Sequence, residues 1–176
     1  HAVCKKEPDL ARLDVDGEWP VWGFMQTLHA DNGKDFRSAT IRDACAEYGI
    51  DLAWRPVRTP HYGGHIERLL GTIAKEIHAL PGTTFSNVQQ RGAYRSEAKA
   101  QMTLDEMRKW LTQWIVNVYH KRLHSRIGTS PEAKWREGLL GDGKRRKGIG
   151  LPPAPADPER VRLDFLPYVD RTVQRD

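Results

Sequence analysis

Two short apolar runs, each followed by a helical pattern, constrain the fold of this chain most. The first run, Phe24–Ala30, ends at the turn residues 31–33, and the second, Ile50–Pro56, ends at its proline. Apolar residues recur at helical spacing over Phe36–Tyr48 and again over Gly63–Leu80. This alternation predicts a mixed α/β domain with helices packed on a sheet. Because two strands make a poor sheet, we expect further strands before residue 1.

Three further helices are predicted from local signals. One ends near Leu13, and a second begins with a capping box at Thr103 and Glu106 and continues to Val118. A third begins at Ser130, an N-cap residue followed by proline. After these helices the composition changes. We expect a catalytic-type domain over residues 1–137, a basic Gly/Pro-rich linker over 138–160, and the first strands of a C-terminal β-module over 161–176.

Composition bounds the class of protein. The 176 residues correspond to about one domain, and 28 Lys and Arg against 23 Asp and Glu give a net charge of +5, which is compatible with a polyanionic partner. Cys4 and Cys45 lie far apart and form no disulfide framework or zinc ribbon, so we expect a reducing compartment. The sequence has no apolar run long enough for a membrane span. It begins without an initiator Met, so we expect a fragment of a longer protein.

Asp31 and Glu67 are the candidate metal ligands. Asp31 ends the first predicted strand, and Glu67 lies in the first turns of the helix after the second. In an α/β layout both carboxylates can meet at one rim of the sheet, where a cation relieves their repulsion. Hard oxygen ligands suit Mg²⁺ or Mn²⁺. Spacing alone favours the alternative, in which Asp31 is an ordinary turn aspartate and Glu67 a solvated helix glutamate.

The segments flanking these two acids resemble a known family. "LHADNGKDF" and "HYGGHIERLLGTI" are similar to the second and third acidic motifs of DDE transposases in the retroviral-integrase superfamily. "WIVNVYHKRLHSRIGTSPEAKW" resembles the segment that follows the Glu helix there, and "RLDFLPYVDRTVQRD" the entrance to a β-barrel. The bacterial transposases of phage Mu and of mercury-resistance transposons are the nearest type. The resemblance implies an RNase H-like core in which Asp31 and Glu67 are catalytic and bind metal.

The same resemblance implies the function and the partners. It predicts metal-dependent cleavage and strand transfer of DNA by a bacterial cytoplasmic enzyme, acting as a homo-multimer on transposon ends and target, with a possible ATPase helper protein. The family uses three acids, and the first is expected upstream of residue 1 with the first strands. We therefore expect the chain to be inactive alone. A non-catalytic DNA-binding or assembly remnant of a transposase is the alternative.

Candidate DNA contacts surround Glu67. The loop before it carries Arg55, Arg58, His61 and Tyr62, which offer forked phosphate donors and a ring for an unstacked base. His65 precedes the glutamate. A rotation of about 100° per residue places Lys75 and His78 on the same helix face as Glu67, beside Gly71. An ordinary surface loop and a solvated helix face are the alternatives.

A basic block and two histidine pairs complete the candidates. Lys144, Arg145, Arg146 and Lys147 lie between glycines and are expected to bind phosphates non-specifically, unless they are a solvated linker. His61 with His65, and His120 with His124, have a spacing that can hold zinc. No matching cysteine pair supports zinc, so we expect the second pair on an exposed face with Lys121 and Arg122.

Overall fold

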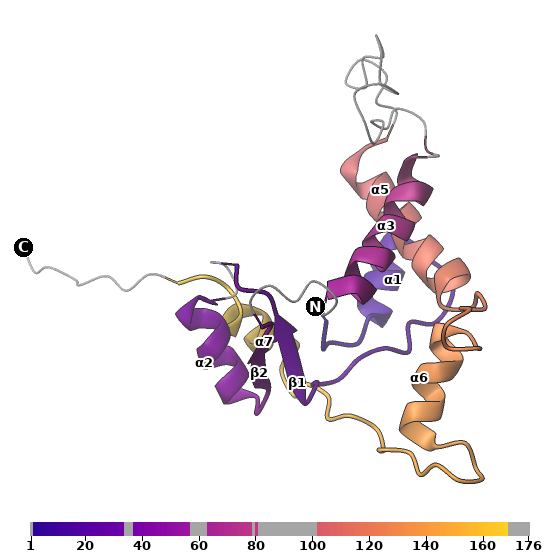
Figure 1. The fold of residues 1–176 in the computed structure, drawn as a ribbon. Coiled ribbons are helices and arrows are strands. Elements are labelled where there is room, and N and C mark those ends of the chain that lie inside the picture. The colour runs from indigo at the N-terminus through magenta and orange to yellow at the C-terminus, as the bar shows by residue number, and fades with distance from the viewer. Residues whose placement is uncertain (1, 34–36, 57–62, 79, 81–101, 169–176) are drawn as a thin grey trace, which may run out of the picture. The chain divides into compact units, whose positions relative to one another are not determined.

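The computed structural model describes residues 2–33, 37–56, 63–78, 80 and 102–168 (Figure 1). The chain divides into two compact units, and each is described by itself. The first unit combines residues 1–55 with 112–176, and the second contains residues 56–111.

A two-stranded parallel sheet lies in the first unit. Strands β1 (Thr27–Ala30) and β2 (Asp51–Trp54) pair so that Ala30 is opposite Trp54. Helix α2 (Ala39–Glu47) connects them, as a parallel crossover requires. Both predicted strands are confirmed, although β1 is shorter than expected. Phe24 lies outside it, with its ring stacked on that of Tyr48 at 4.8 Å between centroids.

Local signals account for the ends of α2. The Ser38 hydroxyl accepts a hydrogen bond from the Ile41 amide at 3.4 Å, which is the N-cap contact. At the other end Gly49 has a φ of +63°, a left-handed conformation that glycine adopts without steric strain. The predicted helix and its terminal glycine are thus confirmed.

A second packed region of this unit joins residues that lie about 100 positions apart in the sequence. Helix α1 (Glu7–Leu13) contributes Leu10 to a core cluster that also contains Val15 and Val116. Val116 is completely buried and belongs to η4 (Ile115–Tyr119), a wide π-helical turn. Helix α5 (Leu104–Trp114) begins in the second unit and runs directly into η4.

The helices of the second unit begin as the sequence predicts. The Thr103 hydroxyl accepts from the Glu106 amide at 3.2 Å, and the Glu106 carboxylate accepts from the Thr103 amide at 2.7 Å, so the capping box of α5 is confirmed. Helix α3 (Gly64–His78) is confirmed as well. None of the residues of α3 is fully buried, and in its apolar stripe Ile66 is 51% and Leu70 is 58% exposed.

The C-terminal region corrects one expectation. Helix α6 (Pro131–Leu140) begins at the predicted Ser130 cap, but it runs through Gly138. Helix α7 (Pro158–Asp164) occupies the segment where strands were expected from Val161, so that expectation is wrong for residues 161–164. The Asp157 carboxylate caps the amides of Glu159 and Arg160 at 3.0 Å, which explains why a helix begins there. Residues 169–176 lie outside the described part. The RNase H-like class and the β-barrel stay predictions.

Candidate functional site

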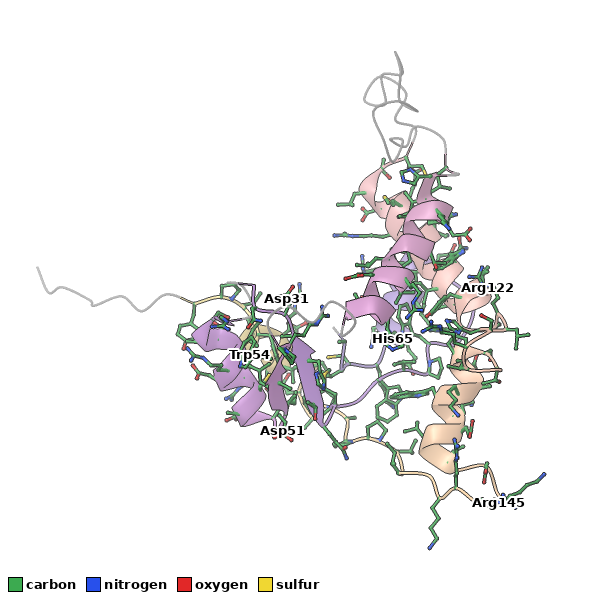
Figure 2. The ribbon with its side chains drawn as sticks, viewed as in Figure 1. Asp31, Asp51, Trp54, His65, Arg122 and Arg145 are labelled. Atoms are coloured by element: carbon green, nitrogen blue, oxygen red, sulfur yellow. The ribbon has the colours of Figure 1, made fainter. Side chains whose placement is uncertain are left out.

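The parallel register brings Asp31 and Arg55 to the same edge of the sheet. Each residue directly follows the last residue of its strand, and the Arg55 amide continues the ladder by donating to the Ala30 carbonyl at 3.0 Å. The ends of β1 and β2 therefore meet as the α/β prediction required. We call residues 31–33 together with Arg37, Trp54 and Arg55 the strand-end site (Figure 2).

Asn32 connects the residues of this site by hydrogen bonds, a role that the sequence did not reveal. Its side-chain amide donates to the Arg55 carbonyl oxygen at 2.9 Å, and its amide oxygen accepts from Arg37 at 2.6 Å. The Arg37 guanidinium in turn lies 5.5 Å from the ring centroid of Trp54, within the range of a cation–π contact. Asn-Gly after a strand indicated only a turn, whereas the structure uses the asparagine to join two strand ends.

Asp31 is exposed at this edge, where it can meet a cation or a phosphate-bearing ligand. Its Oδ1 atom accepts a hydrogen bond from the Gly33 amide at 2.9 Å, as in an ordinary Asx turn. Among the described residues, the other oxygen of this carboxylate has no hydrogen-bond partner. The turn and a metal-binding role are therefore compatible, because only one of the two oxygens is used by the turn.

Glu67 lies in the first turn of α3, in the other unit. It is exposed, as are His65, Lys75 and His78. A Cβ atom built at Gly71 would meet no atom of the described residues within 4 Å, and the approach of DNA to this helix face stays a prediction. Because Asp31 and Glu67 belong to different units, their meeting at one metal centre stays a prediction. In the described part of the chain, no three His, Cys, Asp or Glu side chains gather as a metal site.

The zinc alternative receives no support within the described residues. Arg58, His61 and Tyr62 lie outside them, so the loop contacts and the first histidine pair stay predictions. The expectation of an exposed second pair is wrong for His120, which is 6% exposed and packs edge-on against Trp19 at 5.3 Å between ring centroids. Burial lowers the pKa of its imidazole, and Glu132 opposes this effect.

The basic block is part of a folded loop rather than an extended linker. Lys144–Lys147 are exposed, and Gly141 pairs with Lys147 in a short antiparallel bridge. Figure 2 shows Arg145 extending away from the ribbon. Asp142, which the sequence reasoning missed, accepts hydrogen bonds from three amides of this block. The Asp-Gly dipeptide at 142–143, a common turn signal, was the available indication.

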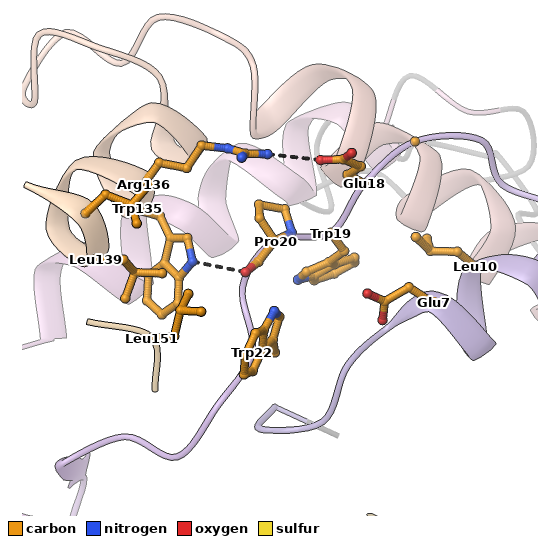
Figure 3. Close-up of a pocket in the computed structure, with 12 residues that line it drawn as sticks. Glu7, Leu10, Glu18, Trp19, Pro20, Trp22, Trp135, Arg136, Leu139 and Leu151 are labelled. Carbon is orange, nitrogen blue, oxygen red and sulfur yellow. Dashed lines mark hydrogen bonds and ion pairs between the residues drawn. The ribbon is translucent and has the colours of Figure 1, made fainter. Parts of the chain in front are cut away.

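A cavity of about 410 Å³ lies elsewhere in the first unit and is lined partly by Trp19, Trp22 and Trp135 (Figure 3). Two contacts connect its walls. The indole nitrogen of Trp135 donates to the Pro20 carbonyl at 3.0 Å, and Arg136 pairs with Glu18 at 2.9 Å. These contacts join α6 to the loop after α1. The cavity is thus a gap between two packed segments, and we assign it no function.

Comparisons with known proteins relate the chain to transposases. A family described as the TnsB C-terminal domain matches residues 1–82, slightly less than half of the chain, and this region contains Asp31 and Glu67. The transposase for transposon Tn552 of Staphylococcus aureus is 25% identical over 118 residues, or 66% of this chain. The chain spans 23% of the length of that relative. Both matches are thus partial, and each is a likeness to a protein or domain of transposition.

None of the helices in the described ranges combines the length and the apolar composition needed to cross a bilayer.

Proposed function

We propose that this chain is part of a DDE-type DNA transposase that cleaves and joins DNA strands with the help of divalent metal ions. The placement of Asp31 carries the proposal. It directly follows a short parallel strand, in a chain related to a transposase, and one of its carboxylate oxygens is available. The resemblance of its flanking motif, and of the motif around Glu67, supports the same assignment.

The chemistry of the two side chains fits Mg²⁺ or Mn²⁺. Asp31 and Glu67 would hold the ions, because hard carboxylate oxygens are the ligands these cations prefer. When bound, such ions activate an attacking oxygen and stabilise a leaving oxygen in phosphoryl transfer. The described residues contain no group of three such ligands, so the proposal needs a further acid, which the resemblance places on another strand.

The other residues of the two regions would hold the DNA. Arg55 lies beside Asp31 at the strand-end site, where a guanidinium can bind a phosphate near the reacting atoms. On α3, Lys75 and His78 are exposed and would contact phosphates of a DNA backbone that approaches beside Gly71, which has no side chain. Arg58, His61, Tyr62 and His65 would add contacts near the glutamate.

A strand-transfer assay on the complete gene product tests this proposal, with DNA that carries the ends of the mobile element and with Mg²⁺ present. We expect Asp31→Asn and Glu67→Gln each to reduce strand transfer to the metal-free level while DNA binding is kept. Asp51→Asn is a matched control, because Asp51 is exposed at the opposite end of the same sheet (Figure 2). Full activity of either of the first two variants would refute that residue's role.

A non-catalytic DNA-binding or assembly module is the second candidate. It is favoured by the absence of a three-ligand metal group among the described residues, alongside a well-formed basic loop. The same assay separates the two candidates. A complete gene product that binds DNA but neither cleaves nor joins it with Mg²⁺ or Mn²⁺ would support the module. A homo-multimer on DNA and an ATPase helper protein belong to both proposals.

A further inference from the structure

The loop of residues 141–150 is folded back on the end of α6 by contacts of several kinds. The Ile149 amide donates to the Gly138 carbonyl at 3.0 Å, and the Gly150 amide donates to the Leu139 carbonyl at 2.9 Å. The Asp142 amide donates to the Arg146 carbonyl at 3.2 Å across the loop. The backbone of the basic block is therefore held at both ends.

Asp142 fixes the interior of this loop. Its Oδ1 atom accepts from the amides of Lys144, Arg145 and Arg146 at 2.8, 2.8 and 2.9 Å. Three convergent donors on one carboxylate oxygen define the backbone path of the residues that carry the positive charges. The same three amides lower the pKa of the Asp142 carboxyl, because they donate to its ionised form.

Gly148 allows the loop to approach the helix. A Cβ atom at this position would lie 2.0 Å from the carbonyl oxygen of Leu139, a backbone atom that cannot move aside without shifting α6. Glycine is thus required by close contact here rather than by backbone conformation. The loop therefore depends on the Asp142 carboxylate and on glycines such as Gly148, which carry no positive charge.

The cations that this loop presents are mostly available. Arg146 pairs with Glu137 at 3.5 Å, but no ion pair is found for Lys144, Arg145 or Lys147 among the described residues. All four are exposed. We propose that Asp142 is a positioning residue for DNA binding, which holds Lys144, Arg145 and Lys147 in an ordered loop that binds consecutive backbone phosphates. This inference rests on the proposed DNA-binding function.

Removing the Asp142 carboxylate has two effects on DNA affinity, and they act in opposite directions. If the block were only a cationic segment, removing the negative charge of Asp142 would strengthen its attraction for DNA. If binding needs an ordered loop, removing Asp142 makes binding weaker. The disordered backbone must then be fixed on DNA, which costs conformational entropy. The two views predict opposite changes for one substitution.

The experiment measures binding of the 176-residue chain to a fluorescein-labelled 20-base-pair duplex by anisotropy at several salt concentrations. We expect Asp142→Ala to weaken binding about tenfold, because order lost in the loop must be regained on DNA. Gly148→Ala changes no charge and should weaken binding similarly. Gly138→Ala is its matched control, since a Cβ there meets no atom within 4 Å, and binding should be unchanged.

The outcomes separate this inference from the proposed function. Binding by the unaltered chain that falls with salt, and a salt slope reduced by roughly 0.9 for each of Lys144→Ala, Arg145→Ala and Lys147→Ala, would support DNA contact by the block. With that result in hand, equal or tighter binding by Asp142→Ala would overturn the role of Asp142. No binding by the unaltered chain would count against DNA binding itself. Loss of amide-exchange protection at Ile149 and Gly150, whose acceptors are the Gly138 and Leu139 carbonyls, would show that the loop is disordered in Asp142→Ala.

Discussion

The side-chain amide of Asn32 donates a hydrogen bond of 2.9 Å to the carbonyl oxygen of Arg55, 23 residues further along the chain. This contact ties the turn after β1 to the end of β2. It therefore holds the backbone on either side of the exposed Asp31 carboxylate. A residue that the sequence presents as an ordinary turn asparagine is thus a structural part of the strand-end site.

Substitution of Asn32 by alanine should loosen this site. The change removes both the bond to Arg55 and the bond from Arg37, and we expect the free energy of unfolding to fall by about 1 kcal/mol. Urea denaturation followed by circular dichroism measures the change. Gln26→Ala is the control, because its exposed side chain makes no hydrogen bond to the described residues, and its effect should stay within about 0.5 kcal/mol. Equal stability of Asn32→Ala and the parent chain would contradict the role of Asn32.

The features that the sequence predicted correctly are local. The Ser130 cap, the capping box at Thr103 and the terminal Gly49 each depend on residues within a few positions, so their short-range chemistry decides the structure. The strands were also predictable, because each lies in a short stretch between turn residues that is too short for a typical helix.

The errors have physical causes. The segment from Val161 was expected to begin a β-module, but the cap formed by Asp157 and the following proline start a helix that buries Val161 to 4% exposure. His120 was expected at the surface because its neighbours are basic, and tertiary packing against Trp19 overrides that pattern. Whether Asp31 and Glu67 meet at one metal centre depends on how distant parts of the chain are placed, which local sequence patterns do not determine.

Tyr48 and Asp164 give a second prediction, which concerns alkaline pH. The Tyr48 hydroxyl donates to Asp164 at 2.6 Å, and this bond, with desolvation, raises the pKa of Tyr48 to about 12. A raised pKa means that the folded state keeps a proton that the unfolded state loses above about pH 10. Stability from this contact is therefore complete below pH 10 and is lost as the pH rises through about 12.

Phenolate absorbance at 295 nm tests this prediction during a pH titration. One tyrosine should ionise near pH 12, and Tyr48→Phe should remove that step. Asp164→Asn should move it toward lower pH, because the neutral amide favours the protonated phenol less strongly. Unchanged titration in Tyr48→Phe would show that another tyrosine is responsible. Tyr168 offers a comparison with Tyr48 in this titration, because its hydroxyl also donates to a carboxylate, that of Asp43, at 2.8 Å.

The start of α5 provides a third prediction. Thr103→Ala removes the hydroxyl that accepts from the Glu106 amide, and loss of such an N-cap lowers helix stability by about 1 kcal/mol. The Glu106 pKa, which the Thr103 amide and hydroxyl hold below its ordinary value, should rise in this variant as far as the hydroxyl contributes. Amide exchange at Glu106 and carboxyl titration by NMR measure both effects. Thr103→Ser keeps the hydroxyl and should behave as the parent chain does; if it is as unstable as Thr103→Ala, the cap is not the cause.

The fourth prediction concerns acid sensitivity and His120. This imidazole is 6% exposed, its buried Nδ1 atom has no hydrogen-bond partner among the described residues, and desolvation lowers its pKa. The unfolded chain therefore takes up a proton near pH 6.5 while the folded chain resists it, so the free energy of unfolding should fall as the pH decreases below about 6.5. Within that window the decrease attributable to one histidine is at most about 1.4 kcal/mol per pH unit.

Two substitutions isolate the contribution of His120. His120→Phe keeps a ring against Trp19 without a titrating group, so the slope of stability against pH below about 6.5 should become shallower. His124→Gln removes an exposed histidine four residues away and should leave the slope as it is. Urea midpoints measured from pH 5 to pH 8 give the comparison. Identical slopes for His120→Phe and the parent chain would mean that the buried imidazole does not resist protonation, and the acid sensitivity would then have to come from other groups.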